Sequence, residues 1–355
     1  MSSYSDPSAT SSDAYSTYVL SVPLYAEGAP YLGSQLEQIY EALTFYIYQN
    51  ATELAILALT LLALSLVIVS LCVVLRRPSK GPVDVKDKRP TLALGGTGLR
   101  IGYEFGCIAA LQDYVDLSDV RITTVSGSIF AGLVLASPKL DIGRMIKALL
   151  NVRDQVMNGE HGGCYLMDPD GTVALIIEEL HKTGGLTEDI LKEISSGDLL
   201  RIGITSFCPW PTTRCVKCPD NFEDLHNVMA AAICIPPFFN RFPRFEGRFA
   251  ADAAFSSWFA VPNDSCPDKV VKLAPFFIPW ARFRSELLYT YGDVCECIYP
   301  FGIDRQLKSF AKGYSRTKSQ LRTPGSWQNA LDLLEDPTDM LNSRIASIRR
   351  VVDRS

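Results

Sequence analysis

The sequence predicts an α/β domain with a mostly parallel central sheet, preceded by one transmembrane helix. Two strand–turn–helix units follow each other between residues 91 and 136, and further strand-like segments come later in the chain. An uncharged apolar stretch, residues 54–75, precedes them all. Repeated strand–turn–helix units imply parallel strands, because the connecting helices cover the faces of the sheet.

The composition excludes several classes of protein. Of the 355 residues, 47% are hydrophobic and 21% are charged, which excludes a disordered or collagen-like chain. Residues 1–53 carry six acidic residues and no Lys or Arg, and we expect a flexible segment there. The residues from Arg76 onward have a net charge of +1, which gives no electrostatic reason to expect nucleic acid as a partner.

Residues 54–75 are predicted to cross a membrane. Twenty-two helical residues are about 33 Å long, enough for the hydrocarbon layer of a bilayer. Basic residues lie only on the C-terminal side of this stretch, in a Pro-containing linker of residues 76–90. Since positive flanks stay in the cytosol, we expect a single-pass protein with a non-cytosolic N-terminus and a cytosolic body.

The chain has ten cysteines, which we expect to be reduced and structural. Cys215 and Cys218 form a C-x-x-C pair, with Cys208 before it and His226 after it. Zinc is the alternative interpretation of this group, but a second C-x-x-C pair or a well-spaced His pair is missing.

The body begins with a strand at residues 91–94, a glycine loop and a helix at residues 101–114. The spacing of Gly96 and Gly98, followed by Ile101, fits neither a dinucleotide fingerprint nor a phosphate-binding P-loop. The remaining interpretations are a plain tight turn, or a loop at a helix N-terminus whose N–H groups hold an oxyanion.

The second unit runs from a β-branched strand at residues 120–125, through Ser126-Gly127-Ser128, to a small-residue helix at residues 129–136. A serine between a strand and a helix is typical of a nucleophile elbow, although Thr124 and Ser128 occupy the usual glycine positions. A structural serine is the alternative interpretation.

Further strands are predicted at residues 199–205 and 249–254. Asp252 lies in the second of them, among apolar neighbours that would raise its pKa, as suits a base for a serine hydroxyl. A turn or helix cap is its alternative role. The three histidines precede Asp252, so a Ser, Asp, His order would need another acid.

Three segments in this order resemble the patatin-like and cytosolic phospholipase A families of lipid acyl hydrolases: 92–102 (LALGGTGLRIG), 124–128 (TVSGS) and 251–254 (ADAA). A fourth, 230–239 (AAAICIPPFF), is similar to the alanine-rich, proline-ended stretch that precedes the catalytic aspartate in those families. The resemblance covers about residues 90–265. It implies a three-layer patatin-like fold, expected over residues 91–320. The amphipathic pattern of the C-terminal residues separately predicts a helical tail over residues 321–355.

The resemblance also implies the roles of individual residues. Ser126 would be the nucleophile and Asp252 its partner in a Ser-Asp dyad, while Gly96, Thr97, Gly98 and Gly127 would form the oxyanion hole. Arg100 matches the arginine after the glycine loop and would orient a lipid phosphate or support the loop. The implied enzyme cleaves fatty-acyl esters of a membrane phospholipid or neutral lipid and needs no cofactor or metal.

Several positions depart from the family pattern. Thr97, Ile101, Thr124, Ala253 and Ala254 each carry a side chain where the family favours glycine, and we expect strained turns there. The alternatives are therefore an inactive member of the fold that serves as a membrane scaffold or lipid-binding module, and an acyltransferase.

Two aromatic and basic stretches, residues 236–245 and 276–283, are expected to form an interfacial lip around the site or to be core loops. The oligomeric state is not predicted.

Overall fold

The computed structural model describes residues 87–98, 100–157, 169–207, 210–235, 241–273, 302–322, 331–334 and 338–354. All of them belong to the second of two units in the chain, Arg77–Ser355. The predicted membrane span, residues 54–75, lies outside the described residues. Among the described helices, none combines the length and the apolar character needed to cross a bilayer.

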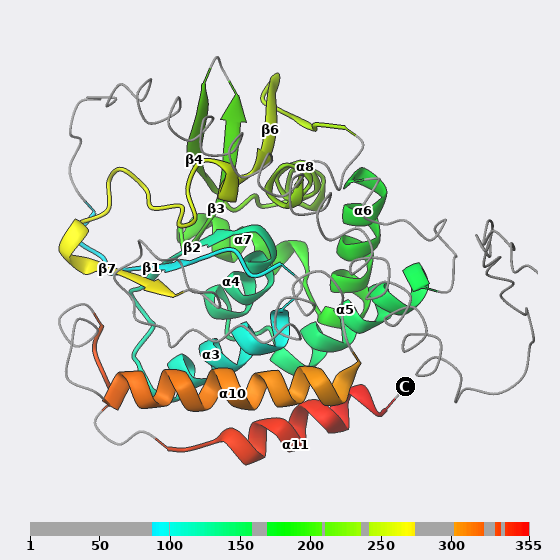
Figure 1. The fold of residues 1–355 in the computed structure, drawn as a ribbon, viewed down its shortest axis with the longest axis vertical. Coiled ribbons are helices and arrows are strands. Elements are labelled where there is room, and N and C mark those ends of the chain that lie inside the picture. Colours follow the sequence, from blue (N-terminus) through cyan, green and yellow to red (C-terminus); the bar gives the residue numbers. More distant parts are fainter. Residues whose placement is uncertain are drawn as a thin grey trace, which may run out of the picture. The chain divides into compact units, whose positions relative to one another are not determined.

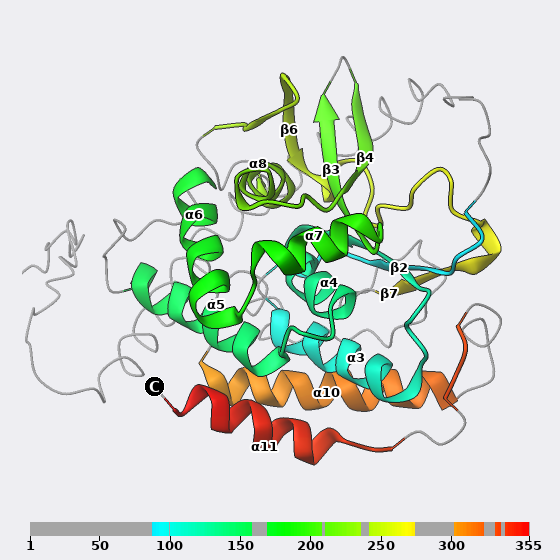
Figure 2. The ribbon, with the colours of Figure 1, turned by 180° about the vertical axis from the view of Figure 1, so that it is seen from behind.

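The expected α/β class is confirmed, with a mixed sheet that is parallel at its centre (Figures 1 and 2). Four neighbouring strands, β7-β1-β2-β3, are parallel, and β4, β5 and β6 join them through antiparallel pairs. The strands are β1 (Thr91–Leu94), β2 (Arg121–Val125), β3 (Leu200–Phe207), β4 (Pro211–Lys217), β5 (Arg244–Phe245), β6 (Arg248–Asp252) and β7 (Val270–Leu273).

Strand β3 organises the sheet because it pairs with three other strands. Strand β4 occupies one edge of β3 over residues 201–207. The other edge pairs first with β2, over residues 200–203, and then with β6, over residues 204–207. Since β2 and β6 run toward each other on this edge, their C-terminal ends meet in the middle of β3.

Helices connect and cover the strands. They are α3 (Ile101–Tyr114), α4 (Ile129–Ala136), α5 (Ile142–Met157), α6 (Pro169–Glu179), α7 (Glu188–Ser196), α8 (Phe222–Ile233), α10 (Ile303–Arg322) and α11 (Leu341–Val352). Helix α4 packs on β2 and β3, and α8 packs on β3 and β6. Helix α11, in the predicted C-terminal tail, packs on α5 and α10.

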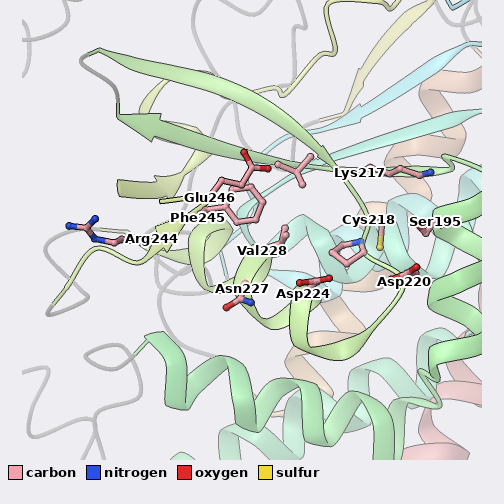
Figure 3. Close-up of a pocket in the computed structure, with 12 residues that line it drawn as sticks. Ser195, Lys217, Cys218, Asp220, Asp224, Asn227, Val228, Arg244, Phe245 and Glu246 are labelled. Carbon is pink, nitrogen blue, oxygen red and sulfur yellow. The ribbon is translucent and has the colours of Figure 1, made fainter. Parts of the chain in front are cut away.

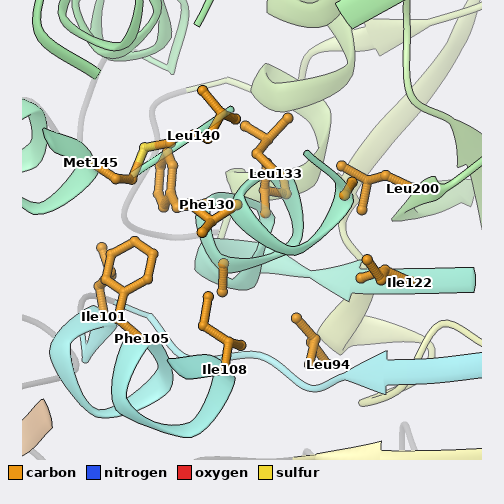
Figure 4. Close-up of a cluster of buried hydrophobic side chains, with 14 of the residues drawn as sticks. Leu94, Ile101, Phe105, Ile108, Ile122, Phe130, Leu133, Leu140, Met145 and Leu200 are labelled. Atoms are coloured by element: carbon orange, nitrogen blue, oxygen red, sulfur yellow. The ribbon is translucent and has the colours of Figure 1, made fainter. Parts of the chain in front are cut away.

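The core lies between the strands and the first two helices (Figure 4). Leu94 of β1 and Ile122 of β2 are buried together with Ile108 of α3 and Leu133 of α4. Each such side chain contributes roughly 1.5–3 kcal/mol when it leaves water. The two predicted strand–turn–helix units thus share one hydrophobic core, which holds the turns between their strands and helices in place.

Helices α3 and α10 lie side by side in an unusually close contact (Figure 1). A Cβ on Gly106 would lie 2.0 Å from the backbone oxygen of Phe310, and one on Gly313 would lie 2.0 Å from that of Tyr103. Any side chain at these positions would therefore separate the helices.

A network of three arginines and three aspartates joins the N-terminal ends of β1, β2 and β3. The buried Arg121 guanidinium pairs with Asp87 and, at 3.0 Å, with Asp264, while Arg201 pairs with Asp198 at 2.8 Å. Arg89 also pairs with Asp87. Asp87 and Arg89, at the end of the predicted linker of residues 76–90, therefore bind the domain at the N-terminal ends of these strands. Ser126 follows the opposite, C-terminal end of β2.

Candidate functional site

Ser126 and Asp252 lie where β2 and β6 meet on β3. Val125, the last residue of β2, pairs with Gly203, and Asp252, the last residue of β6, pairs with the next residue, Ile204. Two residues that are 126 positions apart in the chain thus stand at adjoining strand ends.

Ser126 lies at a sharp turn between β2 and α4. Its φ of 60° is in the left-handed region, which a serine adopts only when the surrounding structure enforces it. The Ser128 hydroxyl enforces the turn: it accepts a 2.7 Å hydrogen bond from the Val125 N–H and donates one of 2.8 Å to the Val125 carbonyl. The geometry is that of a nucleophile elbow, closed by a serine side chain.

The glycine loop after β1 lies against this elbow. A Cβ on Gly127 would lie 2.1 Å from the Gly98 backbone oxygen, and one on Gly96 would lie 3.8 Å from the Ser126 Cβ. Gly98 has a φ of 55°, which favours glycine at that position. In the described part of the chain, the N–H groups of Gly96, Gly98 and Gly127 donate no hydrogen bond to a backbone oxygen. These residues can therefore offer donors beside the Ser126 hydroxyl, as an oxyanion hole requires.

Thr97 and Arg100 hold the loop from behind. The buried Thr97 hydroxyl donates a 3.2 Å hydrogen bond to the Arg100 carbonyl. The Arg100 side chain is only 4% exposed, and its guanidinium lies 4.5 Å from the centre of the Tyr103 ring. This position suits support of the loop better than direct contact with a substrate.

The Asp252 carboxyl group is fully buried and incompletely satisfied. One oxygen, Oδ1, accepts a 2.8 Å hydrogen bond from the Ala254 N–H. The other, Oδ2, has no partner of normal hydrogen-bond geometry among the described residues. Burial raises the pKa of Asp252 to about 6, while interactions with the Ser126 hydroxyl and the Ala254 N–H act to lower it. At neutral pH the group is therefore a carboxylate next to Ser126, able to take up a proton.

Three hydroxyl groups fix the turn that carries Asp252, and the sequence patterns did not indicate them. Thr205 of β3 donates a 2.8 Å hydrogen bond to the Asp252 carbonyl. Ser256 lies 2.8 Å from both the Thr205 and the Thr213 hydroxyl oxygens. This chain of hydrogen bonds ties β3, β4 and the Asp252 turn together.

Trp258 is a further residue that the sequence patterns did not indicate. A Cβ on Gly95 would lie 3.0 Å from the indole nitrogen of Trp258, and one on Gly96 would lie 3.8 Å from its ring carbon Cζ2. The indole therefore covers the glycine loop on the side of Ser126. No local pattern marks such a residue, because it follows the aspartate in an irregular segment.

The expected strain at the departures from the family pattern is wrong. Among the described non-glycine residues, positive φ occurs only at Ser126, Asp198 and Glu246, so none of the five substituted positions adopts it. Two of the added side chains instead fill space left by glycines elsewhere. Gly132 of α4 faces the Thr124 methyl group, and Gly203 of β3 faces the Ala253 methyl group.

The C-x-x-C cysteines do not form a metal site with other described residues. Within the described ranges, no group of three or more His, Cys, Asp or Glu side chains is arranged to hold a metal ion, and Cys208 lies outside those ranges. Cys215 and Cys218 are free thiols, and burial raises the pKa of each to about 12.

Two surface cavities lie away from Ser126 and Asp252. The first, of about 600 Å³, lies between β4, β5 and the start of α8 and is lined by charged groups of both signs, including Lys217, Asp224 and Arg244 (Figure 3). The second, of about 500 Å³, lies between α6 and α8 and is lined by His181 and His226. Both histidine rings contact backbone oxygens, of Leu186 and Asp170 respectively. Neither Ser126 nor Asp252 lines either cavity.

No protein-family model matches the chain, and no curated protein is significantly similar to it.

Proposed function

We propose that this chain is a membrane-anchored serine lipid acyl hydrolase that cleaves fatty-acyl esters with a Ser126-Asp252 dyad. One observation carries the proposal: a buried carboxylate with a free oxygen and a pKa of about 6 adjoins a serine at a left-handed turn. A purely structural aspartate would use both of its oxygens when buried, because an unsatisfied buried acceptor costs about 1–3 kcal/mol.

The proposed reaction has two halves. Asp252 Oδ2 accepts the Ser126 hydroxyl proton as Oγ attacks the ester carbonyl carbon, and N–H groups of the glycine loop and Gly127 hold the oxyanion. The carbon–oxygen bond of the ester then breaks, and the leaving alkoxide takes the proton from Asp252. In the second half, water attacks the carbonyl carbon of the acyl-serine while Asp252 accepts a proton from that water. The bond between this carbon and Ser126 Oγ then breaks, Asp252 returns the proton to Oγ, and the fatty acid leaves.

Three features favour this dyad over an inactive scaffold. The elbow is braced by Ser128, the Asp252 turn is braced by Thr205, and the substituted glycine positions are free of positive φ. The hydrogen bonds of Ser128 restrict the position of the proposed nucleophile, and the hydrogen bond of Thr205 restricts the position of the proposed base. Preorganisation of this kind is what an active serine hydrolase needs.

We further propose that residues 91–320 adopt the three-layer patatin-like fold and that residues 54–75 anchor the protein in a membrane. Support for the fold is the order of strand, glycine loop, helix, strand, elbow, helix and aspartate. Support for the anchor, with a non-cytosolic N-terminus and a cytosolic body, is the uncharged span and its basic C-terminal flank. A tether to the bilayer raises the local concentration of a phospholipid or neutral lipid substrate.

The test is fatty-acid release from phospholipid and triacylglycerol by the purified full chain in detergent micelles. We expect Ser126→Ala and Asp252→Asn each to reduce release to the background rate. Ser196→Ala, which removes an exposed serine hydroxyl from the end of α7, is the matched control and should retain full activity. Equal release by the intact chain and by Ser126→Ala would contradict the proposal, and acyl transfer to an added alcohol without release of acid would favour the acyltransferase.

A further inference from the structure

A row of side chains crosses the far end of the sheet, beyond the dyad. The last pairs of β3 place Phe207 opposite Pro211 of β4 on one side and opposite Phe249 of β6 on the other. Phe249 is in turn opposite Arg244 of β5. Residues that are directly opposite in neighbouring strands share a face, so these four side chains form one continuous row.

The row and its neighbours expose large aromatic side chains. Trp210 and Phe249 are each 50% exposed and Phe242 is 44% exposed, although side chains of this size are usually buried. The Phe242 ring packs edge-to-face on Phe207, with ring centres 5.8 Å apart. We refer to Phe207, Trp210, Phe242, Arg244, Arg248 and Phe249 as the aromatic tip. Figures 1 and 2 both show the ends of β3, β4 and β6 projecting beyond the helices.

The charge of the aromatic tip is positive. Arg244 and Arg248 are exposed, and within the described residues neither forms an ion pair. The Arg244 guanidinium lies 4.6 Å from the centre of the Phe249 ring, which is within the range of a cation–π contact. The neighbouring Arg214 is neutralised by Glu246. The aromatic tip therefore carries two exposed arginines without an ion-pair partner among the described residues, and one of them, Arg244, lies beside an exposed ring.

The aromatic tip lies beyond Asp252 along the same pair of strands, at the C-terminal end of β3. Phe249 precedes Asp252 by three residues on the same strand, which is about 10 Å at the rise of a β-strand. A flat surface in contact with Phe249 would therefore lie about 10 Å from the strand end that carries Asp252.

We infer that the aromatic tip docks the domain on the anionic surface of a lipid bilayer. Tryptophan and phenylalanine rings partition into the headgroup region, and arginines are attracted by anionic lipids, so rings and guanidinium groups together fit that surface. The inference rests on the proposed function and deepens it, because it states how the domain reaches its lipid substrate.

The test measures contact of Trp210 with lipid in the full chain. Ser126→Ala, which cannot consume the lipid, is reconstituted into vesicles of phosphatidylcholine with or without phosphatidylserine, and tryptophan fluorescence is quenched with brominated phospholipid. We expect phosphatidylserine to increase the quenched fraction. Trp210→Phe, also made in Ser126→Ala, should remove this increase in the quenched fraction. The other tryptophans are present in both proteins, so their signal does not affect the comparison.

Charge variants separate docking from simple proximity to the membrane. Arg244→Ala and Arg248→Ala should each lower the ratio of docked to undocked protein about fivefold in phosphatidylserine vesicles. Arg349→Ala/Arg350→Ala removes two exposed charges from α11 and is the matched control, for which no change is expected.

Quenching that is independent of phosphatidylserine, or that survives Trp210→Phe unchanged, would overturn the inference. So would self-association of the intact chain that Phe249→Ser abolishes, without any effect on lipid quenching, because the tip would then be an interface between copies. Since the background lacks the nucleophile, none of these outcomes depends on hydrolysis. Failure of docking and failure of the proposed function are therefore distinguishable.

Discussion

Gly132 of α4 makes room for the methyl group of Thr124 in β2. A Cβ on Gly132 would lie 2.4 Å from Thr124 Cγ2, closer than two carbon atoms can approach. The threonine stands two residues before Ser126, where a nucleophile elbow usually has glycine. The side chain of Thr124 on the strand is therefore accommodated because Gly132, on the helix that packs on this strand, has no side chain.

This pairing predicts a specific rescue. Gly132→Ala should destabilise the full chain by about 1–3 kcal/mol, because overpacking forces side chains and backbone apart. In Thr124→Ser the offending methyl group is absent, so the double variant Thr124→Ser/Gly132→Ala should recover part of that loss in thermal unfolding. Gly184→Ala, where an added Cβ has ordinary contacts of 3.5 Å or more, is the control. Strict additivity of the two changes would refute the pairing.

The sequence could predict the parts of the fold that have local signals. The bounds expected for β1, α3 and α4 agree with the structure, because apolar runs there are interrupted by glycine or by a polar turn. The expected strand at residues 249–254 instead ends at Asp252, where the chain enters a short 3-10 helix. Strand β4 had no such signal, since it begins with proline and is only partly buried.

The rest of the candidate site depends on contacts between distant segments. Ser126, Asp252 and the glycine loop could be found because each lies at a strand end with a recognisable neighbourhood. Thr205 and Trp258 could not, because a threonine within a strand and a tryptophan in a loop are common in any protein. The expected strain failed for a related reason: Gly132 and Gly203 relieve crowding from other elements, which no local pattern records.

The pKa of Asp252 predicts the pH dependence of the reaction with the serine. The base must be ionised to accept the Ser126 proton, so the rate of acylation should rise with pH and level off above about pH 6. Stopped assays of ester cleavage between pH 4 and pH 8 would measure it. Asp252→Asn should show no such rise, and a wild-type rate that stays flat across pH 6 would remove Asp252 from the role of base.

The same shift predicts how stability depends on pH. The folded pKa of about 6 exceeds the unfolded value of 3.8, so the folded state binds the proton more tightly. The contribution of Asp252 to stability is therefore present at low pH and lost as pH rises through 6, a difference on the order of 3 kcal/mol. Asp252→Asn should show a weaker decline in thermal midpoint between pH 4 and pH 6. An equally steep decline of the thermal midpoint in Asp252→Asn would show that other groups cause the pH dependence.

Thr205 is predicted to be a positioning residue. Thr205→Val keeps the shape of the side chain but removes the hydrogen bonds to the Asp252 carbonyl and to Ser256. We expect kcat to fall about fivefold with KM unchanged, since one hydrogen bond is worth about 1 kcal/mol. Thr205→Ser should restore kcat. A loss of kcat that serine does not rescue, or a change confined to KM, would contradict this role.

The buried carboxyl group of Glu104 in α3 is predicted to lower the free energy of unfolding. Both of its carboxyl oxygens are buried without a hydrogen-bond partner in the described residues, and burial raises the pKa of this group well above its usual value. Stability should therefore fall as pH rises from the unfolded pKa toward the folded one. Glu104→Met should raise the thermal midpoint at neutral pH and weaken this fall. Destabilisation by methionine comparable to that of a cavity-forming variant such as Phe105→Ala would show that the carboxyl group makes a necessary contact.

The measurement that tests the central claim most directly is covalent labelling of the full chain by a fluorophosphonate probe, with the modified residue located by tandem mass spectrometry. A serine activated by Asp252 should react stoichiometrically at Ser126 Oγ, and Asp252→Asn should abolish the reaction while Ser196→Ala leaves it intact. A folded, intact chain that stays unlabelled, or that is labelled at another serine with equal yield, would contradict the dyad.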